Sequence, residues 1–140
     1  MTTLMDLVKL EHKIVTDERG ELKVVQFDSN FPFIPKRIFT ISNVPYGEQR
    51  GGHAHRVCHQ IIMVVSGALD LVLKDGMDTL TLRAAQNSEL FWIKPGIWVE
   101  MMNFTNDCAI LVFCSHCYEG VDYIHEFSEL REYNFPKNIS

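Results

Sequence analysis

The sequence lacks several features that would place the protein in a membrane or on a nucleic acid. No apolar run approaches the roughly 20 residues that a membrane-spanning helix needs. Residues 1–6 lack the basic-then-apolar pattern of a secretion signal. Positive charge is scarce, because 13 Lys and Arg stand against 18 Asp and Glu, a formal net charge of −5. We therefore expect a cytoplasmic protein with no membrane partner and no general affinity for nucleic acid, in which an anionic ligand needs a local basic pocket.

Cysteine is present, but not in a pattern that predicts a function. The chain has four, and Cys114 and Cys117 have the C-x-x-C spacing of a redox motif or half a zinc site. A redox motif should open a helix, and a structural zinc site needs a second pair of ligands. Neither is visible in the sequence. We expect reduced thiols in a cytosolic protein.

Long helical patterns are also scarce, and short strands dominate the 140 residues. A hairpin is expected between the first two strands, and another between the last two. A short helix is expected over residues 126–133. This pattern predicts one all-β domain over residues 1–140, a double-sheet jelly roll or small barrel. The expected strands are 7–15, 21–27, 36–42, 60–65, 68–73, 79–82, 90–93, 97–103 and 108–114.

The most informative stretch is residues 47–55, Gly-Glu-Gln-Arg-Gly-Gly-His-Ala-His. In an extended segment, His53 and His55 point to the same face of a sheet. Paired inward imidazoles suit either metal ligation or proton transfer near neutral pH. Gly51 and Gly52 would let a ligand or another backbone approach closely. The stretch therefore predicts a functional site at the mouth of the barrel.

The run from Gly47 to Gly67 resembles the first motif of the cupin superfamily, and residues 95–103 resemble the second. Both depart from the metal-binding pattern. Gln60 stands where cupins usually carry glutamate, and Glu100 aligns with the usual histidine of the second motif. A set of His53, His55 and Glu100 would resemble a two-histidine, one-carboxylate triad, but the neutral Gln60 weakens any divalent site. We expect a double-stranded β-helix that works without metal.

A closer resemblance covers nearly the whole chain. The segments that carry it are residues 31–37, 50–55, 59–60, 95–100 and 118–124. In their content and order, these segments are together similar to the WxcM-like sugar 3,4-ketoisomerases of the cupin superfamily. That resemblance implies a homodimer without metal or organic cofactor. It also implies a dTDP-linked 4-keto-6-deoxyglucose substrate, whose carbonyl moves from carbon 4 to carbon 3, for amino sugars of bacterial surface glycans such as the O-antigen of lipopolysaccharide.

The resemblance also implies roles for individual residues. The family's catalytic base aligns with His53, and His55 would stabilise the enediolate or relay the proton. Arg50 and Arg37 are candidates for a phosphate contact, with a structural ion pair as the alternative for Arg37. Phe39 stands where the family often has a tyrosine, which leaves His53, His55 or Tyr46 to complete the proton transfer. The remaining residues assigned to substrate binding are His59, Gln60, Trp98 and Glu100, of which His59 could instead support a catalytic ring and Trp98 the core.

Two other functions stay open. Residues 17–20 and 50–53 also resemble deoxysugar 3,5-epimerases, which begin with the same type of deprotonation. Their histidine–aspartate couple and tyrosine acid have no assignment in this sequence. The third possibility is a sugar-nucleotide-binding cupin without catalysis, which the missing tyrosine would favour.

Overall fold

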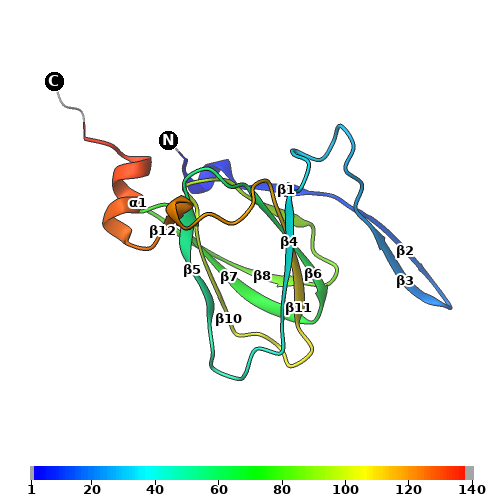
Figure 1. Cartoon of the computed structure of the whole chain (residues 1–140). Helices are drawn as coiled ribbons and strands as arrows, with labels where there is room; N and C mark the ends of the chain where they lie inside the picture. The colour runs from blue at the N-terminus through cyan, green and yellow to red at the C-terminus, as the bar shows by residue number, and fades with distance from the viewer. Residues whose placement is uncertain (1, 138–140) are drawn as a thin grey trace.

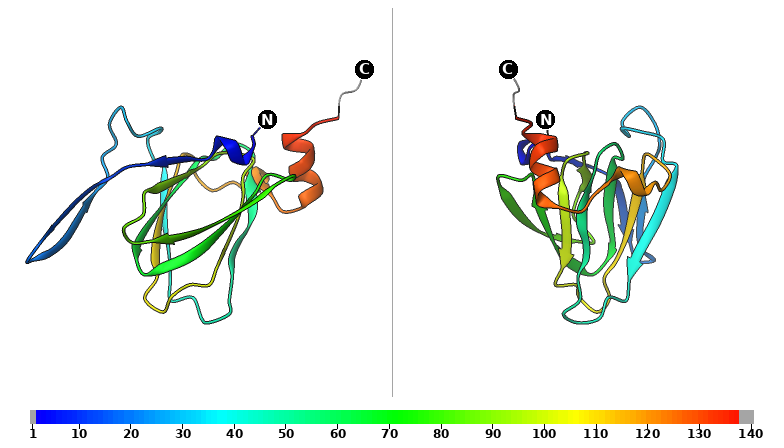
Figure 2. Two further views of the ribbon diagram at one scale, coloured as in Figure 1. Left: turned by 180° about the vertical axis from the view of Figure 1, so that it is seen from behind. Right: turned by 60° about the vertical axis from the view of Figure 1, so that its left-hand side comes forward.

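The computed structural model describes residues 2–137, and ten of its strands form two facing five-stranded sheets (Figures 1 and 2). The first sheet has the order β1-β9-β6-β11-β4 and the second has the order β12-β5-β10-β7-β8. All pairings are antiparallel, so the predicted double-sheet fold is confirmed. The first sheet is built from β1 (Val8–Leu10), β4 (Arg37–Ser42), β6 (Gln60–Ser66), β9 (Leu90–Ile93) and β11 (Ala109–Cys114). The second contains β5 (Arg50–His55), β7 (Ala68–Lys74), β8 (Thr79–Ala85), β10 (Trp98–Met102) and β12 (Tyr123–Ile124).

The core lies between the two sheets, because alternate residues of each strand point inward. Ile62 and Val64 of β6 meet Leu71 and Leu73 of β7 in one buried cluster. The short helices η1 (Leu4–Asp6) and η2 (Gly120–Asp122) lie outside this alternation. Among the described residues, no helix is long and apolar enough to cross a membrane.

Each sheet also has an outer face that a separate segment covers. Aromatic residues of the loop before β4, Phe31 and Phe33, pack on the outer face of the first sheet around Phe113. Helix α1 (Phe127–Asn134) covers the second sheet, where Leu130 contacts Trp98 (Figure 1). The predicted C-terminal helix is therefore confirmed.

The N-terminal part of the chain forms an arm that projects from the barrel. The strands β2 (Lys13–Asp17) and β3 (Gly20–Val24) pair only with each other, and the hairpin extends away from both sheets (Figures 1 and 2). This hairpin was predicted. The expected strand over residues 7–15 is instead two strands, because β1 pairs with β9 before the chain leaves the barrel.

The second predicted hairpin is wrong. Strand β10 pairs with β5 and β7, whereas β11 pairs with β4 and β6. The two strands therefore belong to opposite sheets, and the loop between them crosses from one sheet to the other. Local sequence cannot distinguish such a crossing from a hairpin, because the same turn residues can join two strands of one sheet or two strands of opposite sheets. The two cases differ only in which strands pair in the folded protein.

Candidate active site

Strand β5 places the two predicted histidines side by side on its inner face. The ring centroids of His53 and His55 lie 5.2 Å apart. The intervening Ala54 is fully buried on the opposite face, against Trp98 and Leu130. His55 is 4% exposed, so its ring belongs to the barrel interior. The alternation that the sequence predicted is therefore what brings the two imidazoles together.

The ring of His55 is held by a carboxylate from the other end of the chain. Its Nδ1 lies 2.7 Å from Oδ2 of Asp122. The second carboxylate oxygen accepts hydrogen bonds from the backbone N–H groups of Val57 (2.6 Å) and Cys58 (3.3 Å). Burial by itself would raise the pKa of Asp122, but these hydrogen bonds, with His55 first among them, lower the pKa overall.

This arrangement fixes the chemistry of the two nitrogens of His55. A carboxylate on Nδ1 favours the tautomer with its proton on that nitrogen. Nε2 then carries the basic lone pair. Within residues 2–137, His55 Nε2 is buried and has no hydrogen-bond partner. It is available to a group that enters the barrel.

His53 has a different environment. Its pKa is lowered to about 4 by burial first, and then by the neighbouring His55 and His125. The imidazole is therefore neutral at pH 7 and able to accept a proton. The two histidines differ in kind, since one is a free base and the other is a histidine–carboxylate couple that can hold positive charge.

Tyr123 lies against both rings. Its centroid is 4.8 Å from that of His53 and 4.5 Å from that of His55. Strand β12 provides this position, because Tyr123 pairs in register with His55. The ring of His125 stacks on Tyr123 at 5.7 Å and lies 6.2 Å from that of His53. A phenol is thus within the site, although the sequence analysis gave this residue no role.

Arg37 of β4 faces the same interior. Its guanidinium lies over the rings of Phe39 and Tyr118, at 5.9 Å and 5.8 Å from their centroids. Burial lowers the pKa of Arg37, but the nearby side chains of Tyr123 and Cys114 raise it overall. Arg37 Nε is buried and has no partner in the described chain. No salt bridge to Arg37 occurs among residues 2–137, so the structural ion pair that was its alternative role is absent there.

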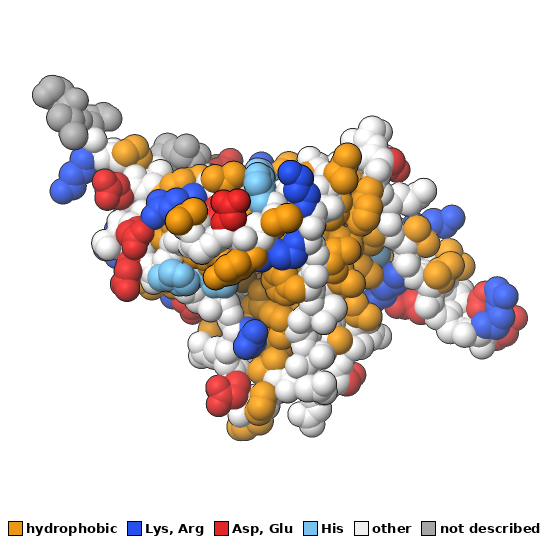
Figure 3. All heavy atoms as spheres, viewed as in Figure 1, with side chains coloured by type: hydrophobic (Ala, Val, Ile, Leu, Met, Phe, Trp, Pro, Cys, Tyr) orange, Lys and Arg blue, Asp and Glu red, His pale blue; other side chains and the backbone are white. Residues whose placement is uncertain are grey.

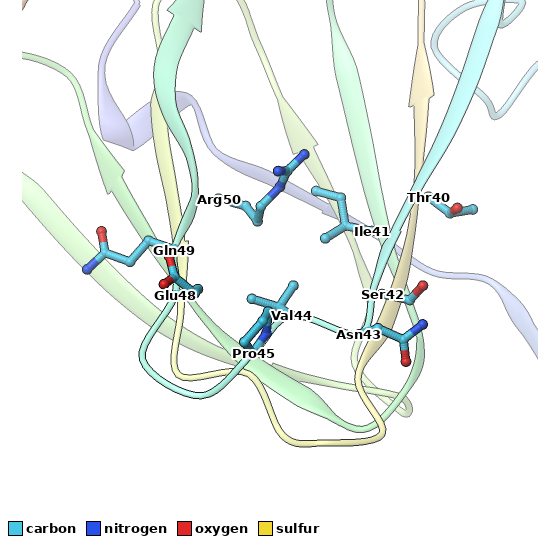
Figure 4. A pocket seen from close by; sticks show the side chains of 9 residues that line it. All are labelled: Thr40, Ile41, Ser42, Asn43, Val44, Pro45, Glu48, Gln49 and Arg50. Atoms are coloured by element: carbon cyan, nitrogen blue, oxygen red, sulfur yellow. The ribbon is translucent and has the colours of Figure 1, made fainter.

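Arg50 lies at the other end of β5, in a cavity of about 470 Å³ between β5 and β4. Figure 4 shows its side chain pointing across the opening toward Ile41, with Val44 below, while Thr40 and Ser42 point away. On the same side of the molecule, Figure 3 shows basic and histidine side chains around an apolar surface between β5 and β4. Tyr46 is fully exposed in the loop from β4 to β5 and does not line this cavity.

Two residues predicted to contact the substrate, His59 and Gln60, lie near the histidines in sequence but form their hydrogen bonds with other side chains. His59 accepts a hydrogen bond at Nδ1 from the indole N–H of Trp92, at 3.1 Å, and makes none to His53 or His55. Burial lowers the pKa of His59. Gln60 is buried and its amide donates to Cys114 Sγ at 3.7 Å. Neither supports a catalytic ring directly.

Trp98 and Glu100 point away from the histidines. The indole N–H of Trp98 donates to Glu100 at 2.9 Å, and its ring stacks on Phe127 of α1 at 4.4 Å. Glu100 also pairs with Lys74 at 3.2 Å. Their placement does not support the predicted substrate contact, because both side chains lie on the outer face of the second sheet.

The same register shows that the cupin metal set does not fit. Val99, not Glu100, pairs with His53 and faces the interior. A valine supplies no ligand atom, and the amide of Gln60 is engaged with Cys114. The triad of His53, His55 and Glu100 cannot form, because Glu100 points to the opposite face of its strand.

Thiols lie beneath His55. Cys58 and Cys114 are both buried, whereas Cys117 is exposed, so the C-x-x-C spacing does not bring its two cysteines into one site. A hydrogen bond from Cys114 lowers the pKa of Cys58, and the same contact, together with burial, raises the pKa of Cys114. None of the four cysteines forms a disulfide within residues 2–137.

Asp122 and Tyr123 are the site residues that sequence reasoning missed. Both fall in a segment that carried the family resemblance, but neither received a role. Asp122 lies 67 positions from His55, so no local spacing points to the pair. The only signal in the sequence was their place in that segment.

Comparisons with known proteins find relatives over nearly the whole chain. The family model FdtA, described as WxcM-like, C-terminal, matches residues 2–134. The TDP-4-oxo-6-deoxy-α-D-glucose-3,4-oxoisomerase of Aneurinibacillus thermoaerophilus is 29% identical over 130 residues, which cover 93% of this chain and 94% of that protein.

Solved structures give the same picture. A variant of the 3,4-ketoisomerase QdtA from Thermoanaerobacterium thermosaccharolyticum, in complex with TDP-4-keto-6-deoxyglucose, has a TM-score of 0.88 and 27% identity, with 94% of this chain and 95% of that chain covered. The TDP-fucose-3,4-ketoisomerase WlaRA from Campylobacter jejuni has a TM-score of 0.83 and 28% identity, covering 93% and 96%.

An epimerase, RmlC from Mycobacterium tuberculosis, is 14% identical with a TM-score of 0.71, which shows a shared fold alone. The match to the family model extends over nearly the whole chain. The protein therefore belongs to the WxcM-like FdtA family.

Proposed function

We propose that this protein is a sugar-nucleotide 3,4-ketoisomerase acting on a dTDP-linked 4-keto-6-deoxy-hexose. The observation that carries the proposal is the inward-facing pair formed by a half-buried, neutral His53 and a buried His55 held by Asp122. Relatives at 27–29% identity support it, because they are 3,4-oxoisomerases or 3,4-ketoisomerases of TDP-linked sugars. One of them, a variant, is in complex with TDP-4-keto-6-deoxyglucose.

The two histidines suit the two halves of the reaction. The hydrogen on carbon 3 is acidic because it lies next to the carbonyl at carbon 4. His53 accepts that proton, and the electron pair moves into a carbon 3–carbon 4 double bond, which leaves negative charge on the oxygen of carbon 4. Once that oxygen is protonated, the hydroxyl on carbon 3 loses its proton and carbon 4 receives one. Bonds and protons then balance, and the carbonyl has moved to carbon 3.

His55 and Tyr123 serve the oxygens in this scheme. The couple of His55 with Asp122 can hold positive charge, so it stabilises an enediolate that lies beside Nε2. Tyr123 is the phenol nearest to both imidazoles, and we assign it the proton transfers that a tyrosine at the position of Phe39 would otherwise make. The earlier alternative, Tyr46, lies outside the cavity in the exposed loop.

The substrate lies along β5. Five residues of a strand span about 16 Å, so Arg50 and His55 are separated by about the length of a sugar joined to a diphosphate. With the hexose at the histidines, the diphosphate reaches toward Arg50 and the cavity that it lines. Arg37 faces the hexose end, where its unpaired Nε favours contact with a ring oxygen or the nearer phosphate. These two arginines provide the local basic surface that a chain of net charge −5 needs.

The remaining predicted residues act at a distance. Gln60 holds the Cys114 thiol through a hydrogen bond, and His59 accepts a hydrogen bond that holds Trp92 next to the start of β6. Trp98 and Glu100 hold α1 against the sheet that carries the histidines. We further infer that the enzyme is a cytoplasmic homodimer that supplies amino-sugar precursors for surface glycans such as the O-antigen.

One observation favours a second candidate. A histidine–aspartate couple beside a tyrosine is what the sequence analysis associated with the 3,5-epimerases, and His55, Asp122 and Tyr123 form such a group. The epimerase would exchange the hydrogens of carbons 3 and 5, whereas the ketoisomerase exchanges those of carbons 3 and 4.

Solvent exchange separates the candidates. The protein is incubated with TDP-4-keto-6-deoxyglucose in deuterium oxide, and the sugar is analysed by NMR. Deuterium at carbons 3 and 4 supports the proposal, deuterium at carbons 3 and 5 indicates the epimerase, and no deuterium indicates a binding protein. Addition of a 3-aminotransferase then identifies the amino sugar, and with it the configuration at carbon 4.

A further inference from the structure

Three side chains of different types that can bind a metal lie close together around His55. The potential ligand atoms of His55, Cys58 and Asp122 lie within 4.8 Å of one another. They supply an imidazole nitrogen, a thiol sulfur and a carboxylate oxygen, a donor set that zinc accepts. This set differs from that of the cupin motifs, because it contains neither Gln60 nor a residue of β10.

Two further observations support a ligand at this place. The side chain of His55 is only 5% exposed, and its Nδ1 lies 2.7 Å from Asp122 Oδ2, so two donor atoms already face each other in a buried site. Besides its contact with the Cys114 thiol, Cys58 Sγ has only long contacts to oxygen: 3.4 Å to the carbonyl oxygen of His59 and 3.9 Å from the hydroxyl of Ser115. A cation bound at Nδ1 would give Cys58 Sγ a stronger partner.

The site can contract to the size that a cation needs. Zinc bonds of 2.0–2.3 Å in a tetrahedron separate the ligand atoms by about 3.3–3.7 Å. The present separations of up to 4.8 Å require a closure of about 1 Å. Only His55 lies on a strand, while Cys58 follows the end of β5 and Asp122 belongs to the three-residue helix η2, so strand pairing fixes neither of these two.

From this arrangement we infer that a soft divalent cation of the zinc class binds reversibly to His55, Cys58 and Asp122 and inhibits the enzyme. Binding replaces the proton shared by His55 and Asp122 and removes the imidazole from the reaction. Three protein ligands leave the fourth position for water. The inhibitory part rests on the role proposed above for His55, whereas the binding part does not.

Cobalt reports on the site directly. The protein is treated with a chelator, kept reduced with a phosphine, and titrated with Co²⁺. We expect a thiolate-to-cobalt charge-transfer band in the near ultraviolet, which Zn²⁺ abolishes by competition. The band should be lost in Cys58→Ser and kept in the matched control Cys117→Ser, whose thiol is exposed and outside the cluster. No band, or an equal band in Cys58→Ser, would overturn the site.

Two further measurements complete the test. X-ray absorption at the zinc edge on the wild-type protein should show one sulfur among nitrogen and oxygen ligands, and this result does not depend on the folding of a variant. Zn²⁺ should inhibit wild type and Cys117→Ser alike, and Cys58→Ser should need at least tenfold more zinc for the same fractional inhibition. A band without inhibition would overturn the inhibitory claim. A band in a protein whose metal-free form never isomerises the sugar would instead contradict the proposed function.

Discussion

At the scale of single residues, the two histidines are alike in sequence and different in the structure. His53 lies among His55, His125 and Tyr123 and forms no salt bridge with a carboxylate of residues 2–137, whereas His55 is bound to Asp122. Replacing His53 with Asn keeps a polar group but removes the base, and positioned acid–base catalysis contributes roughly a hundred- to ten-thousand-fold. We expect kcat of His53→Asn to fall by that order.

The control for this prediction is ligand binding. The affinity for dTDP, measured by calorimetry, should change little in His53→Asn, because the nucleotide is assigned to the Arg50 end of the strand. His55→Asn should lose turnover as well, by a smaller factor. Near wild-type turnover in His53→Asn with a large loss in His55→Asn would mean that the two roles are reversed.

The environment of His53 also predicts how stability depends on pH. Its pKa is about 4 in the folded protein and about 6.5 in the unfolded chain. Between these values the unfolded chain binds the extra proton, so the contribution to stability is present above about pH 6.5 and is lost as the pH falls toward 4. Urea unfolding at pH 7.5 and pH 5.5 should therefore show a smaller decrease for His53→Asn than for wild type. The exposed His116 provides the matched control, and an equal change in His116→Asn would contradict the assignment.

At the scale of elements, β5 is shaped by two glycines in series. Gly51 and Gly52 have φ of 82° and 86°, so both positions favour glycine. They differ in their surroundings. A Cβ on Gly51 would lie 2.6 Å from the backbone oxygen of Val99, where the register between β5 and β10 shifts, whereas a Cβ on Gly52 would meet nothing within 4 Å.

The pair provides a matched test of strand packing. Gly52→Ala bears only the backbone strain, about 1–2 kcal/mol. Gly51→Ala bears a similar strain and must also push β10 away, which adds about 1–3 kcal/mol. Urea unfolding should therefore rank Gly51→Ala as the less stable variant. If the two variants unfold alike, the close approach of β5 and β10 does not contribute to stability.

At the scale of the whole molecule, the projecting arm is the surface on which we expect a second copy of the chain to dock. An isolated two-stranded hairpin is marginally stable in water. The arm also exposes apolar side chains, with Val15 and Leu22 at 39% and 59% exposure. Since unpaired apolar strands commonly dock on a second copy, we expect light scattering at micromolar concentration to give the mass of a dimer.

A charge on the arm tests which surface forms the dimer. Leu22→Lys should raise the dissociation constant of the dimer, because burial of the charge is unfavourable. Met77→Lys is the control, since Met77 is also exposed, at 72%, but lies in the turn between β7 and β8. A monomer mass for the wild-type protein would refute the dimer. An equal effect of the two substitutions would place the interface elsewhere.

The whole enzyme should also work without metal. Val99 occupies the interior position where the second cupin motif would place a ligand, and Gln60 is bound to Cys114. Isomerisation should therefore survive exhaustive treatment with EDTA, and it should rise if inhibitory zinc was present. Activity that EDTA removes and one divalent ion restores would show that the histidines are metal ligands in the active enzyme.

The sequence by itself determined the features that depend on local alternation. The period of two in residues 50–55 sets His53 and His55 on one face, and the apolar strands with their turns predict the double-sheet fold. The turn at residues 16–20 predicts a hairpin, and the tail predicts the helix α1. In each case the side-chain pattern within a few residues decides the outcome, so no distant contact is needed to predict it.

Only the tertiary structure decided the features that depend on distant partners. In the structure, β10 and β11 lie in opposite sheets, and Trp98 and Glu100 face outward. Asp122 and Tyr123 lie against the histidines. The choice of strand partner depends on how both sheets bury their inner faces together, which no short window of the sequence records. The fold, and not the histidine motif, makes His53 a neutral base and His55 a carboxylate-bound one.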